Sequence, residues 1–365
     1  MVVFLPGRYQ GGLRIRNGGT CQSASDDDTR KIVFQAADSD AVVLDGSLPA
    51  DRKINILIAG NCIAIRNFVV KVPDIAGSTV AILNLGRDNE IAYNHIAYDG
   101  NLVPTSGFAH ADGIVLRNRA WVHENRIHSV TVGVSLVGHG TGAGHRSVVE
   151  GNVVFDVNKG DLEDADCFKA VKNTTNGDFF GAIIRGNECY GWHDDGFDGL
   201  DTRNLEVSDN FFHDPDPFAD HPTCIKPGYY SVNQTIIGNR CLGLPRKGGQ
   251  RYCIDAQGTQ SSIFEGNYCD GGTYGIYLQR GAGRGNNNRF IRNTIINAFE
   301  AAFFLAQGGV KGTILRDNTF SGTVRDMLIT SGGTVTGSGN RFLNDKNNKG
   351  FGKYLGGQND SKGPL

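Results

Sequence analysis

Long apolar runs, methionine, tryptophan and proline are scarce in this sequence. No stretch of 18 or more apolar residues occurs, so no segment is predicted to cross a membrane. Only 2 methionines, 2 tryptophans and 10 prolines are present among 365 residues, whereas glycine reaches 51. Abundant glycine without runs of helix-favouring residues predicts a turn-rich β protein.

The charge balance indicates no preference for nucleic acid or a membrane. Lysine and arginine number 36, aspartate and glutamate 38, and the formal net charge is −2 at pH 7. A balance this close to zero argues against long-range attraction to either partner, so neither is expected. An acidic polymer would have to be held by a local group of basic side chains. We expect the chain to act as a monomer.

No secretory leader is recognisable, because Met1–Leu5 runs directly into a Pro6-Gly7 turn. The eight cysteines are an even number, which fits an oxidising compartment. The protein is therefore expected to be secreted and extracellular, with its leader already removed. A cytosolic location is the alternative.

An internal repeat is the dominant pattern that the sequence does contain. A short strand-like segment that ends in asparagine recurs at intervals of 22 to 35 residues. Apolar residues alternate around each asparagine, as expected for a strand. The recurring asparagines are Asn67, Asn94, Asn125, Asn152, Asn187, Asn210, Asn239, Asn267, Asn293, Asn318 and Asn340.

A repeat of this length with strand periodicity predicts an all-β, right-handed parallel β-helix of roughly ten or more coils. Helical repeats would need helical periodicity, and propeller blades need about 40 residues or more. Asparagine tolerates the left-handed turn conformation, and stacked asparagine amides can hydrogen-bond from coil to coil. We assign residues 1–344 to a single β-helix domain. Residues 345–365 are polar and are predicted to form a loose C-terminal tail.

A second register of apolar residues supports the same fold. Most of its members are preceded by glycine or cysteine, and they recur at intervals of 20 to 34 residues. This pattern predicts a second strand in each coil, with these anchor residues pointing inward. The anchors are Ile114, Val134, Phe168, Phe197, Ile225, Ile254, Ile276, Phe303 and Leu328.

Several cysteines occupy equivalent slots of adjacent coils. Such cysteines are either disulfides or stacked thiols in the interior, where cysteine packs as a small apolar residue. The candidate pairs of this kind are Cys224 with Cys253 and Cys241 with Cys269, and two further candidates are Cys21 with Cys62 and Cys167 with Cys189.

The second register also predicts neighbours on the outer face, because stacked coils place equivalent residues about 4.8 Å apart. Asp166, Asp194, Asp195 and Asp198 are expected to converge over two coils, with Lys226 on the next coil. A solvated surface of Asp-rich turns is the alternative. Converging carboxylates raise one another's pKa unless a cation compensates them. Because no His or Cys accompanies them, they favour Ca²⁺.

Ca²⁺ beside a lysine suits β-elimination from a uronic acid. A proton must leave C5, next to the carboxylate, and a bound Ca²⁺ would neutralise that carboxylate and stabilise the developing enolate. Lys226 would be the base, because a nearby cation lowers the pKa of its amine. A simple ion pair of Lys226 with Asp198 or Asp255 is the structural alternative.

Three segments resemble a known family. Asp166-Cys167-Phe168, Asp194-Asp195-Gly196-Phe197-Asp198 and Ile225-Lys226-Pro227-Gly228 are similar to the calcium and base motifs of the family-nine pectate lyases. The resemblance implies a right-handed β-helix that cleaves polygalacturonate. It also implies that the four aspartates of these segments bind calcium and that Lys226 is the base. Cys167 and Cys224 stand where the family usually has glycine.

Other residues near this cluster are candidates for holding the substrate. Arg203, Arg251 and Arg280 can bind uronate carboxylates in a bidentate way, and Tyr229 can stack on a sugar ring. A solvated or packing role is the alternative for each. The predicted function is cleavage of a uronic-acid polymer, first of all pectate, by a polysaccharide lyase. The alternatives are an inverting hydrolase or uronate epimerase on the same fold, and a non-catalytic carbohydrate-binding β-helix.

Overall fold

The computed structural model describes residues 1–21, 30–39, 41–45, 53–74, 77–100, 110–138, 146–158, 162–171, 179–245, 250–279, 285–306, 310–330, 334–344 and 353–356. The chain divides into two compact units, unit 1 (Met1–Asp194) and unit 2 (Asp195–Leu365). Each unit is described by itself.

Unit 1 consists of parallel strands in three sheets, called A, B and C. Sheet A contains β1 (Val2–Phe4), β4 (Ile32–Ala36), β7 (Ile63–Arg66), β10 (Asn89–Ala92), β13 (Ala120–His123), β16 (Val148–Glu150) and β20 (Ile183–Arg185). Sheet B contains β2 (Gly7–Gln10), β5 (Val42–Asp45), β8 (Val69–Lys71), β11 (His95–Ala97), β14 (Arg126–His128), β17 (Val153–Val157) and β21 (Glu188–Trp192). Sheet C contains β3 (Leu13–Ile15), β6 (Ile54–Ile58), β9 (Thr79–Asn84), β12 (Ala111–Leu116), β15 (Val132–Val137) and β18 (Asp166–Val171). The 3₁₀ turn η1 (Leu162–Asp164) and the short strand β19 (Phe179–Phe180) complete the described elements.

Unit 2 repeats the same three sheets. Sheet A contains β24 (Glu206–Ser208), β27 (Thr235–Ile237), β30 (Ile263–Glu265), β33 (Arg289–Ile291), β36 (Thr313–Arg316), β39 (Thr334–Ser338) and β41 (Lys353–Gly356). Sheet B contains β25 (Phe211–His213), β28 (Arg240–Leu244), β31 (Tyr268–Gly271), β34 (Thr294–Ala298), β37 (Thr319–Gly322) and β40 (Arg341–Phe342). Sheet C contains β22 (Asp195–Leu200), β26 (Thr223–Lys226), β29 (Tyr252–Asp255), β32 (Tyr274–Leu278), β35 (Ala301–Leu305) and β38 (Arg325–Ile329). The short strand β23 (Thr202–Arg203) lies between β22 and β24 in the chain.

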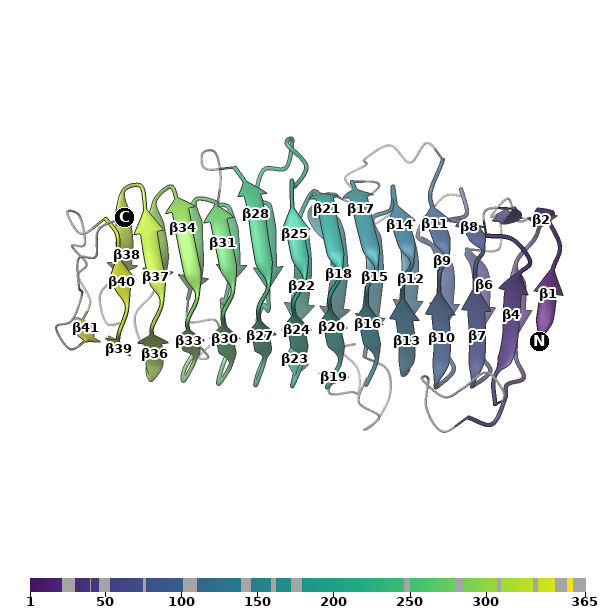
Figure 1. The fold of residues 1–365 in the computed structure, drawn as a ribbon, viewed down its shortest axis with the longest axis horizontal. Helices are drawn as coiled ribbons and strands as arrows, with labels where there is room; N and C mark the ends of the chain where they lie inside the picture. The colour runs from purple at the N-terminus through teal and green to yellow at the C-terminus, as the bar shows by residue number, and fades with distance from the viewer. Residues whose placement is uncertain are drawn as a thin grey trace. The chain divides into compact units, whose positions relative to one another are not determined.

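The chain visits the sheets in rotation, and each strand pairs in parallel with the strand one coil later. Ile127 of β14 pairs with Val154 of β17 in unit 1, and Ile236 of β27 pairs with Phe264 of β30 in unit 2. Figure 1 shows the strands of successive coils side by side in unit 1 (purple to teal) and again in unit 2 (green to yellow). The predicted all-β parallel β-helix is confirmed. The described residues contain no helix long and apolar enough to cross a membrane.

Asparagine amides form a buried ladder along the turn between sheets A and B. In unit 1, the Nδ2 of Asn94 donates to Oδ1 of Asn125 at 3.0 Å, and this bond repeats to Asn152 and Asn187. In unit 2 the ladder runs through Asn210, Asn239, Asn267, Asn293, Asn318 and Asn340. A buried amide is costly without partners, and here each amide supplies partners to its neighbour. The predicted stacking of asparagines is confirmed.

Two details of the asparagine prediction are wrong. The backbone N–H of Phe68, not Asn67, occupies the ladder slot and donates to Asn94 Oδ1 at 3.0 Å. The left-handed turn position is the residue before the ladder, where Asn67 (φ 64°) and Tyr93 (φ 58°) lie. The ladder positions therefore need asparagine for the hydrogen bonds of its side-chain amide. They do not need its tolerance of the left-handed conformation, because the preceding residue adopts that conformation.

The anchor register is confirmed with one correction. Phe197 pairs with Ile225, Ile225 with Ile254, and Ile276 with Phe303. Phe303 then pairs with Met327, so Met327 is the anchor of β38 and the predicted Leu328 is wrong by one residue. Methionine fills the same inward space, and Leu328 pairs instead with Phe304.

The slot before each anchor faces sheet B across the interior of the coil. Where this slot holds glycine, a large side chain fills the space opposite. A Cβ on Gly133 would lie 2.4 Å from Cγ1 of Val154, and a Cβ on Gly196 would lie 2.6 Å from Cδ1 of Phe212. Other coils place two cysteines across the same interior, and these form three of the four disulfides.

The four disulfides are Cys21–Cys62, Cys167–Cys189, Cys224–Cys241 and Cys253–Cys269. The first two were predicted. The pairing of Cys224 with Cys253 and of Cys241 with Cys269 is wrong, because cysteines in equivalent slots lie on the same sheet and point inward side by side. Their sulfurs instead bond across one coil, from sheet C to sheet B. In the chain-entropy view, each such loop of 16 or 17 residues adds about 3 kcal/mol of stability.

Candidate active site

Unit 2 brings three of the predicted site residues together on the outer face of sheet C. Asp195 and Asp198 lie on β22, and Lys226 ends β26, the next strand of the sheet. The strand register places Asp198 directly beside Lys226. The side chain of Lys226 is 24% exposed, so this cluster lies at the outer face of the sheet. The predicted adjacency is confirmed, and the roles of these residues stay predictions.

Lys226 is the member of this cluster that reaches solvent. Its Nζ lies 2.6 Å from Oδ2 of Asp195 and 3.7 Å from Oδ1 of Asp198. The lysine side chain is 24% exposed, whereas those of Asp195 and Asp198 are 1% and 3% exposed. The closer partner is therefore Asp195, which the simple ion-pair alternative did not name. An approaching sugar would meet the amine first, with the carboxylates beneath it.

The carboxylates of this cluster outnumber its cation. Burial raises the pKa of Asp195, and the charges of Asp198 and Asp255 raise it further against the effect of the Lys226 ammonium. Burial likewise raises the pKa of Asp255 to about 6, although the N–H of Gln257 donates to it at 3.0 Å. Among the described residues, three carboxylates lie close to one lysine here, an arrangement that a further cation would relieve.

Tyrosines continue the outer face of sheet C beyond Asp255. The rings of Tyr252 and Tyr277 lie with centroids 4.6 Å apart, and Tyr274 lies 5.8 Å from Tyr252. Burial raises the pKa of Tyr277 to about 12, and the charge of Asp255 adds to this effect. Tyr229 is 41% exposed and helps to raise the pKa of both Tyr252 and Tyr277. Tyr252 is only 7% exposed and its hydroxyl donates to Oε1 of Gln250 at 2.5 Å, so a sugar could reach the partly exposed rings of Tyr274 and Tyr277.

Unit 1 carries the other two predicted calcium ligands. Asp166 begins β18 and is fully buried. Its Oδ2 lies 2.8 Å from Nζ of Lys169, which also lies 2.6 Å from Oδ1 of Asp164. The backbone N–H of Asp194 donates to the carbonyl oxygen of Ala165 at 3.1 Å. A carboxylate oxygen of Asp194 therefore comes within 4.8 Å of one from Asp166.

The predicted substrate-binding arginines have different settings. The backbone of Arg203 on β23 bridges to Val232, at the turn that leads from sheet C to sheet A. Arg251, which directly precedes β29, donates from a guanidinium nitrogen to the carbonyl oxygen of Ala219 at 3.1 Å. This bond links the loop before β26 to the start of β29. Arg280 lies outside the described residues. Their binding of uronate stays a prediction.

Three residues of these clusters were not predicted as site residues. Asp255 could have been found, because it follows the anchor Ile254 as Lys226 follows Ile225. Lys169 stands in the same register after Phe168, so its pairing with Asp166 could have been inferred. Asp164 carried no signal, because it belongs to η1, outside the strand register.

The donor atoms of the aspartates suit a hard cation. They are carboxylate oxygens, the ligand type that Ca²⁺ prefers in proteins. A second close group, Cys224, Cys241 and Cys253, is built from disulfide-bonded cysteines, which lack the thiolate that metal binding needs.

Comparisons with known proteins agree with the fold. The family model described as "Right handed beta helix region" matches residues 165–347. No curated protein matches the chain in sequence.

Solved structures similar to this chain include several polysaccharide-degrading enzymes. A mannuronic-acid-specific polysaccharide lyase of family 6 from human gut microbiota has a TM-score of 0.69 at 13% identity, and the match covers 92% of this chain and 80% of that one. A PL6 alginate lyase in complex with a trisaccharide has a TM-score of 0.60 at 11% identity, with 97% and 78% covered. The catalytic unit of a GH87 α-1,3-glucanase from Streptomyces thermodiastaticus has a TM-score of 0.59 at 12% identity, with 96% and 64% covered. At these identities the likeness concerns the fold.

Proposed function

The chain belongs to the right-handed β-helix family, and from that premise we propose that it cleaves a uronic-acid polysaccharide by β-elimination with Lys226 as the base. Polygalacturonate is the first proposed substrate, by resemblance to the family-nine pectate lyases. Alginate is the second, because two structurally similar proteins are described as lyases of mannuronic acid or alginate.

The observation that carries the proposal is the position of one amine above buried carboxylates. Lys226 is the solvent-reaching group of a cluster whose aspartates are almost inaccessible. A base must come within hydrogen-bond reach of the proton it removes. The amine of Lys226 can approach the C5 hydrogen of a uronate lying on sheet C, whereas Asp195 and Asp198 cannot.

Ca²⁺ is proposed as the cofactor, with Asp166, Asp194, Asp195 and Asp198 as its ligands. When bound, the ion would supply a Lewis acid that neutralises the uronate carboxylate. Asp195 and Asp198 now hold the ammonium form of Lys226. Once they are engaged by a cation, they would no longer favour that form, and the pKa of Lys226 would fall. The neutral amine could then take the C5 proton, a double bond would form between C4 and C5 as the bond from C4 to the leaving oxygen breaks, and that oxygen would take a proton from water.

A hydrolase is the second candidate, and one observation favours it. A general acid must carry a proton near neutral pH, and Asp195 and Asp255 both have a raised pKa. A structurally similar glucanase uses the same fold. The two candidates differ in their products, because hydrolysis leaves saturated ends and elimination leaves a conjugated double bond.

The deciding experiment follows ultraviolet absorbance during digestion of polygalacturonate, alginate and a glycosaminoglycan panel. We expect absorbing products from a uronic-acid polymer, with loss of the signal in excess chelator and recovery with added Ca²⁺. Reducing ends that appear without absorbance would support the hydrolase. Binding without cleavage of any polymer would support a non-catalytic carbohydrate-binding protein.

A further inference from the structure

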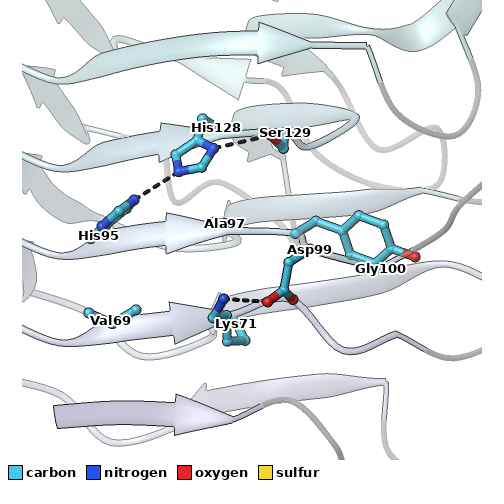
Figure 2. Close-up of a pocket in the computed structure, with 9 residues that line it drawn as sticks. Val69, Lys71, His95, Ala97, Asp99, Gly100, His128 and Ser129 are labelled. Atoms are coloured by element: carbon cyan, nitrogen blue, oxygen red, sulfur yellow. Dashed lines mark hydrogen bonds and ion pairs between the residues drawn. The ribbon is translucent and has the colours of Figure 1, made fainter. Parts of the chain in front are cut away.

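A pocket of about 420 Å³ lies on the outer face of sheet B in unit 1, and the proposed lyase activity makes no use of it. Its lining includes Lys71, His95, Asp99, His128 and Ser129. Figure 2 shows His95 and His128 pointing toward each other, with the Lys71–Asp99 ion pair beside them. The pocket exists because Ala97, a small residue, pairs with both Lys71 and His128 on the neighbouring strands.

The strand register brings the Nε2 edges of the two imidazoles together, with the ring planes tilted by 43°. His95 begins β11 and His128 ends β14, with His95 paired to Arg126 and Ala97 paired to His128. The histidines therefore occupy a diagonal of two adjacent parallel strands, and their Nε2 atoms lie 2.8 Å apart. Arg126 is drawn away from His95, because its guanidinium lies over the ring of Phe155 at 4.4 Å.

The remaining nitrogen of His128 is also engaged. Nδ1 of His128 lies 3.1 Å from Oγ of Ser129, and the ring stacks on Phe155 with centroids 4.7 Å apart. An imidazole whose Nδ1–H donates to an oxygen presents the lone pair of Nε2, the arrangement seen in metal-ligating histidines. Burial, together with the charges of His95 and Arg126, lowers the pKa of His128 and so favours the neutral ring.

We propose that His95 and His128 form a transition-metal site that links the coils of β11 and β14. Metal–nitrogen bonds of about 2.0–2.1 Å require the two nitrogens to be about 2.9 Å apart for a right angle at the metal, and about 3.4 Å apart for a tetrahedral angle. The observed 2.8 Å fits the right angle. Square-planar or octahedral ions such as Cu²⁺ and Ni²⁺ are therefore favoured over tetrahedral Zn²⁺. Water, or Asp99 released from Lys71, can supply further ligands.

The test is a calorimetric titration of the tag-free protein with CuCl₂ and NiCl₂ in excess Ca²⁺. Calcium prefers oxygen ligands and would occupy carboxylate sites without competing for imidazole. We expect one Cu²⁺ per chain with micromolar affinity, at least tenfold weaker binding to ZnCl₂, and electron paramagnetic resonance of two nitrogen ligands. His95→Ala and His128→Ala should each weaken Cu²⁺ binding at least tenfold.

His213→Ala is the matched control, since it removes a histidine from unit 2 that lies 2.9 Å from Asp214 and should leave Cu²⁺ affinity unchanged. Thermal unfolding without metal checks that each variant folds, and His128→Asn serves as a second variant if the alanine variant does not. Equal Cu²⁺ affinity in wild type and both histidine variants, or a resonance spectrum with one nitrogen ligand, would overturn the proposal. Neither result bears on cleavage by Lys226, so the two proposals fail independently.

Discussion

Two buried charge clusters, one in each unit, are built in opposite ways. In unit 1, Glu90 is surrounded by Lys31, by Arg66 at 2.7 and 2.9 Å, and by His123 at 3.4 Å. Burial would raise the pKa of Glu90, but hydrogen bonds from these three side chains hold it well below its ordinary value. In unit 2, Lys226 lies among Asp195, Asp198 and Asp255, and the pKa values of Asp195 and Asp255 are raised.

The difference concerns the balance of charge and the access of solvent to each cluster. The Glu90 cluster has more cations than anions, and its Lys31–Glu90 pair is closed to solvent, with side chains only 1% and 2% exposed, whereas Arg66 is 19% exposed. The Lys226 cluster has an excess of anions, and its amine reaches solvent. A group of like charges is costly in the folded protein and is retained where function needs it. The Lys226 cluster is therefore the better candidate for chemistry.

The largest effect should come from removing the base. Lys226→Ala is expected to lower the rate of uronate cleavage about 1,000-fold, within the usual range for general acid–base catalysis. Lys226→Arg should be equally inactive, because arginine keeps the charge and does not release its proton. The measurement is ultraviolet absorbance of the products. Lys311→Ala is the control and should keep full activity; a rate for Lys226→Ala within threefold of wild type would exclude the base assignment.

Removing Glu90 should have the next largest effect. Glu90→Ala leaves the buried Lys31 and the partly buried Arg66 without their carboxylate, and removing one partner of a buried ion pair typically costs about 3–5 kcal/mol of unfolding free energy. Urea unfolding followed by circular dichroism measures this loss. If Glu90→Ala lost less than about 1 kcal/mol of unfolding free energy, the Glu90 cluster would not be the stabilising ion cluster that the comparison assumes.

Acid should act on the Glu90 cluster in a defined direction. A carboxylate with a lowered folded-state pKa adds stability above its unfolded value of 4.5, and this stability is lost as the pH falls below that value. The difference in melting temperature between wild type and Glu90→Gln is therefore expected to be largest at neutral pH and to shrink from about pH 4.5 toward pH 3. A difference that stays constant over this interval would contradict the assignment.

The smallest effect, opposite in sign, is expected for Asp255. Replacing one of three neighbouring carboxylates by an amide relieves repulsion, so Asp255→Asn should stabilise the metal-free protein by roughly 1 kcal/mol. Thermal unfolding in chelator measures the gain. Destabilisation by this change would show that favourable contacts of the Asp255 carboxylate outweigh its repulsion by the other two. The Lys226 cluster would then no longer differ from the Glu90 cluster in its charge balance.

Much of the fold could be predicted, because parallel coils repeat local patterns. The asparagine register and the anchors from Ile114 to Phe303 are visible in the sequence, and they place Asp198 beside Lys226. Errors arose where a slot accepts several side chains. In the asparagine ladder, Phe68 occupies a position that holds asparagine in the other coils, and its backbone N–H makes the hydrogen bond to Asn94. In the anchor register, β38 has Met327 where the other strands have a branched or aromatic residue.

Contacts between two sheets within one coil were harder to predict than contacts between neighbouring coils of one sheet. The sequence register gives neighbours along a sheet but not the partner across the interior. For this reason, Cys224 was paired with the wrong cysteine, although Cys241 follows its ladder asparagine by two residues as Cys189 and Cys269 do. The preference of Lys226 for Asp195 depends on side-chain reach, which a strand register does not contain.

The disulfides across single coils also determine what happens when the backbone is cut. Cys224 and Cys241 enclose the whole of β27, and Cys253 and Cys269 enclose β30. A protease that cleaves between the members of either pair would leave both pieces covalently attached. Such a nicked chain would migrate as one species on a gel until a reductant separated it, and its broken coil would remain tied across the interior.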